Sequence, residues 1–160
     1  MTHELTPLDI RILEAIQNDA SLSTAELAEK VGLSQSPCWR RLQKLKEEGY
    51  IVRQVAILNR ERFGQEFVVF AFVKVAALTS EQRKEFNRKV ENLPAILECY
   101  SVLGDYDIII KVIASSLREY QDFIFDTVMR LPGVQDVRST AALSVLKNTT
   151  AIPVRGAVSL

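Results

Sequence analysis

The sequence predicts an α+β protein: an N-terminal (winged) helix-turn-helix domain joined to a ferredoxin-like βαββαβ domain. Two observations support this fold class. Three short segments with helical periodicity fill residues 1–50, and a glycine separates the second from the third. Apolar strands and amphipathic helices then alternate in the order β-α-β-β-α-β through residues 63–153. Residues 51–62 read as a strand and linker between the domains, and residues 154–160 as a C-terminal tail.

Capping signals mark the first two helices. Thr6 precedes a proline and stands three residues before Asp9, which predicts a helix start. Ser23 and Glu26 form a capping box at the start of the second helix, and Gly32 is placed to end it. We therefore expect two short helices in the first 32 residues.

The third helix starts at Ser34 or Ser36 and ends before Gly49. Its inward side is expected to carry Cys38, Leu42 and Leu45. A glycine-containing turn between two such helices is typical of a helix-turn-helix, whose second helix reads DNA bases. An ordinary three-helix core is the alternative.

The outer side of the third helix is polar and basic. Residues 34–46 contain four basic residues and no acidic one, although the net charge of the whole chain is zero. This pattern favours docking on DNA, although a solvated helix face is the alternative. The residues expected to read bases are Gln35, Ser36, Trp39, Arg40 and Gln43. Those expected to contact phosphates are Arg41, Lys44 and Lys46. Ser34 is also predicted to bind DNA. Two interpretations of Trp39 remain open: its side chain contacts DNA, or it packs against the first helix.

The second part of the chain alternates strands and helices. The expected elements are a strand at 51–58 leaving the helical domain, strands at 67–78, 96–103, 107–114 and 134–146, and helices at 80–93 and 116–131. The segments Phe67–Val73 and Ile108–Ile110 are apolar at every position, so both faces of the sheet need cover. We expect a second copy of the chain to supply that cover, which gives at least a dimer.

Composition argues against an enzyme and against a membrane protein. His3 is the only histidine and the chain has neither a P-loop nor a GxGxxG motif, so we expect no catalytic site, metal site or cofactor. The longest apolar run is too short to span a bilayer, and the first residues do not resemble a signal peptide. Cys38 and Cys99 are read as free thiols in a reducing cytoplasm.

Four segments carry a family resemblance. Leu33–Leu42, Gly104–Asp107, Leu131–Val134 and Lys147–Pro153 resemble motifs of the Lrp/AsnC family of prokaryotic transcription regulators. The resemblance implies a nucleoid-associated protein with a ferredoxin-like effector domain, which forms dimers through its sheet and often octamers. It also implies that amino acids bind between dimers. Trp39 departs from the aliphatic residue common in the family, which leaves the base preference open.

The effector site is expected at a turn between two strands. Backbone N–H groups of such a turn can hold a carboxylate, and adjacent acids can hold an ammonium group. The predicted residues are Leu103, Gly104, Asp105, Tyr106 and Asp107, with Ser139, Thr140 and Ala141 from the last strand nearby. The alternative is a plain hairpin turn. The small residues 139–141 suggest room for a medium or large effector side chain.

Together these features predict a sequence-specific DNA-binding regulator of transcription. Its expected partners are double-stranded DNA and a small effector, an amino acid or a related molecule, that modulates its assembly or DNA affinity. A ligand-independent architectural DNA-binding protein is the alternative. A siroheme-decarboxylase-like enzyme is a weaker one, since those enzymes rely on histidines that this chain lacks.

Overall fold

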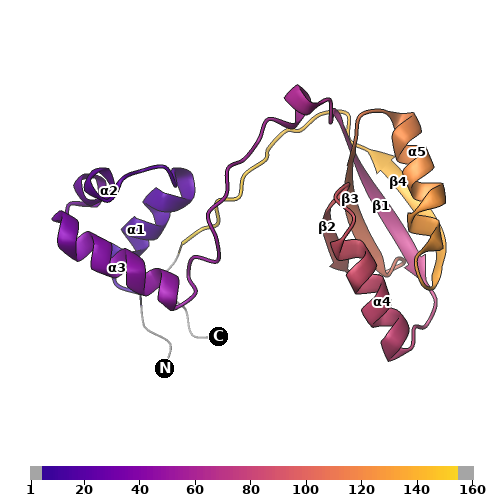
Figure 1. The fold of residues 1–160 in the computed structure, drawn as a ribbon, viewed down its shortest axis with the longest axis horizontal. Helices are drawn as coiled ribbons and strands as arrows, with labels where there is room; N and C mark the ends of the chain where they lie inside the picture. The colour runs from indigo at the N-terminus through magenta and orange to yellow at the C-terminus, as the bar shows by residue number, and fades with distance from the viewer. Residues whose placement is uncertain (1–4, 155–160) are drawn as a thin grey trace. The chain divides into compact units, whose positions relative to one another are not determined.

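The computed structural model describes residues 5–154, which fold into two compact units (Figure 1). Within the described range, one unit comprises residues 5–57 with 147–154, and the other comprises Leu58–Leu146. His3 and residues 155–160 of the expected tail lie outside the described residues. Among the residues that are described, no helix is long and apolar enough to cross a membrane.

The first unit contains three helices, α1 (Pro7–Asn18), α2 (Thr24–Val31) and α3 (Gln35–Glu47). Thr6 with Asp9, and Ser23 with Glu26, form reciprocal capping boxes, which confirms both predicted starts. These bonds satisfy N–H groups that have no partner inside a helix.

The turn between α2 and α3 depends on a glycine. Gly32 has a φ of 73°, a left-handed conformation that glycine adopts without a steric penalty. Its backbone N–H bonds back to the last turn of α2, so the helix ends there and α3 begins three residues later, at Gln35. The predicted helix-turn-helix is therefore present.

A small apolar core joins the three helices. Cys38, Leu42 and Leu45 are buried on the inner side of α3, as predicted. Ile12 of α1 and Leu27 of α2 are buried in the same cluster. Because five large side chains in this unit pack around one centre, the three helices form one body and α3 keeps its other side exposed.

The segment after α3 differs from the prediction. Residues 51–58 form no strand, since they are extended but have no ladder partner among the described residues. A strand needs a neighbouring backbone, and sequence periodicity cannot supply one. The expected strand at 51–58 is therefore wrong.

The C-terminal segment packs on the first unit. The side-chain amide of Gln17 in α1 donates to the carbonyl of Ile152 at 3.0 Å, and its Oε1 accepts from the Ile152 N–H at 3.1 Å. Val154 packs against the helical core. We expected the second domain to run to residue 153, but residues 147–154 belong by contact to the helical unit.

The second unit has the predicted βαββαβ order. It contains η1 (Arg60–Phe63), β1 (Phe67–Val75), α4 (Ser80–Glu91), β2 (Ile96–Ser101), β3 (Ile108–Ala114), α5 (Leu117–Asp126), η2 (Val128–Arg130) and β4 (Val134–Ala141). The sheet order is β2-β3-β1-β4 and every neighbouring pair is antiparallel. This is the ferredoxin-like arrangement that the sequence predicted.

Every strand and helix of this unit is shorter than expected, and two of them end five residues early. β4 was expected to reach residue 146 but ends at Ala141, because β1 begins at Phe67 and offers no backbone beyond the bond between Ala142 N–H and Val68 O. The helix expected at 116–131 ends at Asp126 and continues as the short 3₁₀ helix η2.

The two faces of the sheet differ in their cover. On one face Val69, Ala71 and Val73 of β1 are buried in a cluster with Phe86 of α4 and Ile124 of α5. The opposite face, here called the open face, carries apolar side chains that lie outside this helix-covered cluster among the described residues, although Val68 on it is buried. Its apolar members, placed by strand register, are Val68, Phe70, Phe72, Tyr100, Ile109 and Ile113. Phe70, near its centre, is 36% exposed.

We predict that Gln17→Ala weakens the attachment of the C-terminal segment. The change removes both bonds to Ile152, and one net hydrogen bond contributes about 1 kcal/mol. Hydrogen exchange at the Ile152 amide, followed by NMR, should accelerate roughly fivefold. Asn18→Ala is the control, since the side-chain amide of Asn18 donates to the Glu14 carbonyl within α1, and it should leave the Ile152 amide unchanged. Equal exchange rates of the Ile152 amide in wild type and Gln17→Ala would show that these two hydrogen bonds do not hold the C-terminal segment.

Candidate functional site

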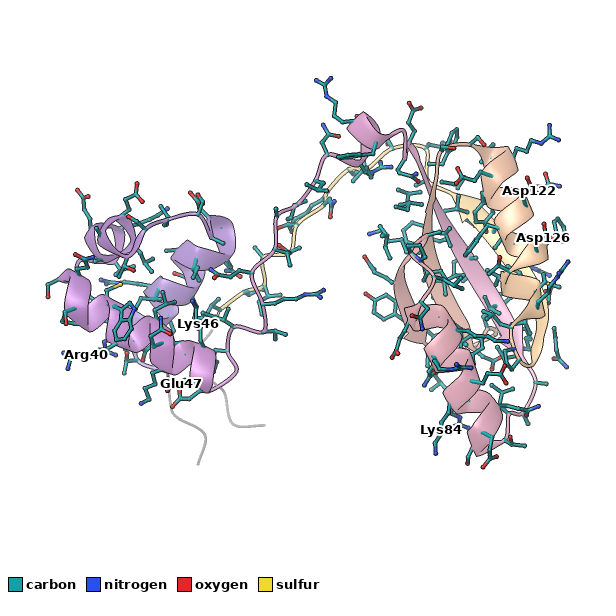
Figure 2. All side chains as sticks on the ribbon, in the orientation of Figure 1. Arg40, Lys46, Glu47, Lys84, Asp122 and Asp126 are labelled. Atoms are coloured by element: carbon teal, nitrogen blue, oxygen red, sulfur yellow. The ribbon has the colours of Figure 1, made fainter. Side chains whose placement is uncertain are left out.

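The outer side of α3 forms an exposed row. Gln35, Trp39 and Gln43 recur every four residues, which places them along one line of the helix. Trp39 is 51% exposed and does not belong to the helical core, so its ring faces outward rather than packing against α1. Ser36 and Arg40 are exposed beside this row, and Figure 2 shows Arg40 extending from α3. Four of the five predicted base-reading residues are therefore exposed on this side of α3, and Gln43 is half-buried.

Positive charge is concentrated in the later half of the same helix. Lys44 and Lys46 are exposed, and Figure 2 places Lys46 on α3 with Glu47 near the end of the helix. Lys44 Nζ lies 3.7 Å from the carboxylate of Glu48. Ser34 occupies the N-cap position of α3 but forms no side-chain cap, so its hydroxyl does not satisfy the first N–H groups of the helix.

Arg41 lies in a different place from the one predicted. Its Nη1 donates to Asp9 Oδ1 at 2.9 Å and to the Thr6 hydroxyl at 3.2 Å, both at the start of α1. The sequence prediction assigned Arg41 to phosphate, but its guanidinium is turned toward the protein. The spacing in the sequence indicates this orientation, because Arg41 is three residues after Cys38 and four before Leu45 and so continues the inward side of α3.

Asp9 is the acidic partner in this contact and was not predicted as a functional residue. Its side chain is 3% exposed. Burial raises the pKa of the Asp9 carboxyl, but hydrogen bonds from the hydroxyl and N–H of Thr6, and then from Arg41, outweigh burial and leave the pKa below its usual value. Asp9 is therefore a buried anion stabilised from two helices.

The turn from Leu103 to Asp107 is tied to the end of β1. Lys74 Nζ donates to the Asp105 carbonyl at 2.7 Å. The backbone N–H of Asp107 donates to Val73 O at 3.1 Å, and its Oδ2 accepts from the Val75 N–H at 2.8 Å. One carboxylate oxygen of Asp107 thus has a structural partner. The turn is consequently held at a fixed place beside the sheet.

Aromatic contacts extend this turn onto the open face. The rings of Tyr106 and Phe72 have centroids 5.7 Å apart, and the Arg138 guanidinium carbon lies 6.0 Å from the Tyr106 ring. Lys74, Phe72 and Arg138 were missed from the sequence, because they come from other strands and only the strand register brings them to the turn.

The structure separates the last-strand residues from one another. Thr140 pairs with Phe70 in the register and shares the open face with Arg138. Ser139 pairs with Ala71 on the helix-covered face, and its hydroxyl hydrogen-bonds the Tyr120 hydroxyl at 2.6 Å. Ala141 pairs with Val69, also toward the helices. Alternation along a strand puts neighbours on opposite faces, so residues 139–141 cannot all meet one ligand from a single side.

Ser139 borders a small hollow between α5 and β4. This hollow has a volume of about 280 Å³, and its lining includes Phe125, Met129 and Val137. Nowhere among the described residues is a group of three or more histidine, cysteine, aspartate or glutamate residues arranged to hold a metal ion.

Family models match both units. Residues 5–52 match a winged helix-turn-helix DNA-binding model, and residues 68–152 match the Lrp/AsnC ligand binding domain. The chain belongs to the Lrp/AsnC family. It is therefore a DNA-binding transcriptional regulator with a separate ligand-binding domain, and the predicted fold class and family are confirmed.

Individual relatives align over nearly the full chain. The proline dehydrogenase transcriptional activator of Rhizobium radiobacter is 33% identical over 148 residues, covering 92% of this chain and 95% of that protein. The DNA-binding transcriptional activator DecR of Escherichia coli K12 is 33% identical over 150 residues, covering 94% and 99%. Both relatives are transcription regulators rather than enzymes by their names.

Solved structures agree with this assignment. A transcriptional regulator from Neisseria meningitidis in complex with L-Met has a TM-score of 0.89 and 32% identity, covering 93% of this chain and 96% of that one. An AsnC family transcriptional regulator from Agrobacterium tumefaciens has a TM-score of 0.88 and 36% identity, covering 93% and 97%.

Proposed function

We propose that this regulator reads a pseudo-palindromic DNA site with the outer side of α3, and that a free amino acid bound near the turn 103–107 changes its DNA affinity or assembly. The observation that carries the DNA part is the outer side of α3, on which Trp39 is 51% exposed and Arg40 is exposed. A recognition helix requires such a face, because its side chains must reach base edges in the major groove.

Two groups of side chains have different roles in this proposal. Gln35, Ser36, Trp39, Arg40 and Gln43 contact base edges, with the Trp39 ring placed to meet apolar groups such as a thymine methyl. Lys44 and Lys46 contact phosphates. Ser34 and the uncapped first turn of α3 also suit a phosphate oxygen, since helix N-terminal N–H groups attract anions.

Replacing Arg40 with alanine should reduce sequence discrimination. Loss of one base contact costs about 1–3 kcal/mol on the cognate site and little on random DNA. Lys46→Ala is the matched control, because losing a phosphate contact weakens binding to all sequences alike. The measurement is affinity for cognate and random duplexes at fixed salt. Equal losses on both duplexes for Arg40→Ala would reject its assigned role.

We also propose that the open face is covered by a second copy of the chain. Phe70 and Phe72 lie on it, and large apolar surfaces of this kind are typical of interfaces. Two-fold symmetry would place two α3 helices on half-sites about one helical turn, or a multiple of it, apart. Further assembly of dimers to octamers, and location with the nucleoid in the cytoplasm, complete this part of the proposal.

A charge on the open face should break the dimer. Phe70→Glu would bury a carboxylate between copies, whereas Phe125→Glu places the same charge on the exposed side of α5. Sedimentation of the full chain at micromolar concentration should give a dimer or larger for wild type and Phe125→Glu, and a smaller species or aggregation for Phe70→Glu. A monomeric wild type would reject this interface.

The amino-acid effector is supported by charge at the turn. A free amino acid has a carboxylate and an ammonium group, and the turn brings backbone N–H groups and two acids together with Lys74 and Arg138. The Neisseria meningitidis relative was solved with L-Met. Leu103, Gly104, Asp105, Tyr106 and Asp107 form the proposed site, with Thr140 on the same face; Ser139 and Ala141 would have to contribute from the other side of β4.

A thermal-shift screen of the twenty amino acids should identify the effector, and Asp107→Asn should then weaken its binding. Asparagine keeps an acceptor for the Val75 N–H but removes the charge that would hold an ammonium group. Calorimetry compares this variant with wild type, and Asp122→Asn on α5 is the control for charge removal. Unchanged affinity in a folded Asp107→Asn variant removes the residue from the site. If no amino acid stabilises the protein, a ligand-independent DNA binder is favoured.

A further inference from the structure

Two neighbouring arginines of α3 point in different directions. At about 100° per residue around the helix axis, Arg41 lies beside the buried Cys38 and Leu45, whereas Arg40 lies on the opposite side of α3. Arg40 is exposed, whereas Arg41 is half-buried and its Nη1 contacts two side chains of α1. These two basic residues are thus adjacent in sequence but have different surroundings.

The two carboxylate oxygens of Asp9 accept hydrogen bonds from different parts of the helical unit. Its Oδ2 accepts from the N–H of Thr6 at 2.9 Å and from the Thr6 hydroxyl at 2.5 Å, which caps α1. Its Oδ1 accepts from Arg41 at 2.9 Å. One oxygen therefore fixes the start of α1 and the other fixes the middle of α3.

This contact is directional, unlike the apolar packing around it. Cys38, Leu42 and Leu45 hold α3 against the core, but apolar contacts tolerate small rotations and shifts. A guanidinium bound to a carboxylate requires a defined distance and angle. The Asp9 side chain is 3% exposed and that of Arg41 is 36% exposed, so the carboxylate is shielded from water although the arginine is only partly buried.

We infer that Arg41 is a positioning residue: through Asp9 it fixes the rotation of α3 so that Trp39 and Arg40 face the groove, and it contacts no phosphate. The inference rests on the proposed function, in which α3 reads DNA. It assigns a role to Asp9 as well, although that residue lies outside the recognition helix.

Salt dependence separates positioning from phosphate contact. Each phosphate neutralised by a protein cation adds about 0.9 to the slope of log affinity against log salt. Removing a phosphate contact therefore lowers the slope by about one, whereas rotating the helix lowers the preference for the cognate site. A general loss of stability would reduce the active fraction and weaken cognate and random binding equally.

The experiment measures affinity of the full chain for cognate and random duplexes across a salt series. The variants are Arg41→Gln, Arg41→Lys, Asp9→Asn and the double variant Asp9→Asn/Arg41→Gln, with Lys46→Gln as the phosphate-contact control. We expect each single variant at the pair to lower the cognate-to-random ratio roughly tenfold, in line with coupling between residues of one hydrogen-bond network. The double variant should be no worse than either, and the salt slope on random DNA should stay at the wild-type value.

Three results would overturn the inference. Arg41→Gln lowering the salt slope by about one, as Lys46→Gln is expected to do, would make Arg41 a phosphate contact. Arg41→Lys with wild-type affinity and specificity would show that charge alone suffices. Equal losses on cognate and random DNA would leave the pair a purely structural role. If Asp9→Asn does not fold, the two Arg41 variants decide between these outcomes.

Failure of the proposed function gives a separate pattern. In that case the wild type and every variant, including Arg40→Ala, would show no preference for any site. The positioning role would then be rejected together with DNA reading. Loss of the preference in the Arg41 and Asp9 variants alone supports the inference and retains the proposed function.

Discussion

The second unit depends on the pairing of one central strand. β1 has nine residues and bonds to β3 on one side and β4 on the other. Its alternate residues Val69, Ala71 and Val73 build the core beneath the helices. Its last residues hold the turn 103–107 by backbone bonds at Val73 and Val75. The core, the open face and the candidate ligand site are therefore all positioned by β1.

Local chemistry made much of the fold predictable. The capping boxes at Thr6 and Ser23, and the glycine turn at Gly32, depend on residues within four positions of one another, so the sequence displays them directly. The βαββαβ order was also predictable, because apolar strands and amphipathic helices have different periods.

The errors share one physical origin, which is a partner far away in the chain. Residues 51–58 have strand-like composition but no neighbouring strand, and β4 ends where β1 no longer accompanies it. Arg41 was assigned to phosphate because the acid that binds it lies 32 residues earlier. Ser139 was grouped with Thr140 although the pleat of β4 sends them to opposite faces. Sequence proximity therefore shows which residues are neighbours in a segment, whereas long-range register decides the direction of each side chain.

The bond between Gln17 and Ile152 makes the helical unit discontinuous in the chain. Its partners are separated by 135 residues, and Val154 adds a packing contact to the same core. Contacts with a large sequence separation form late, because the intervening chain must first be made and closed into a loop. During synthesis the three helices can assemble soon after they emerge, but they acquire their last contacts only once residue 154 has left the ribosome. The completed form of the DNA-binding unit is thus available only in a chain whose second domain has already been translated.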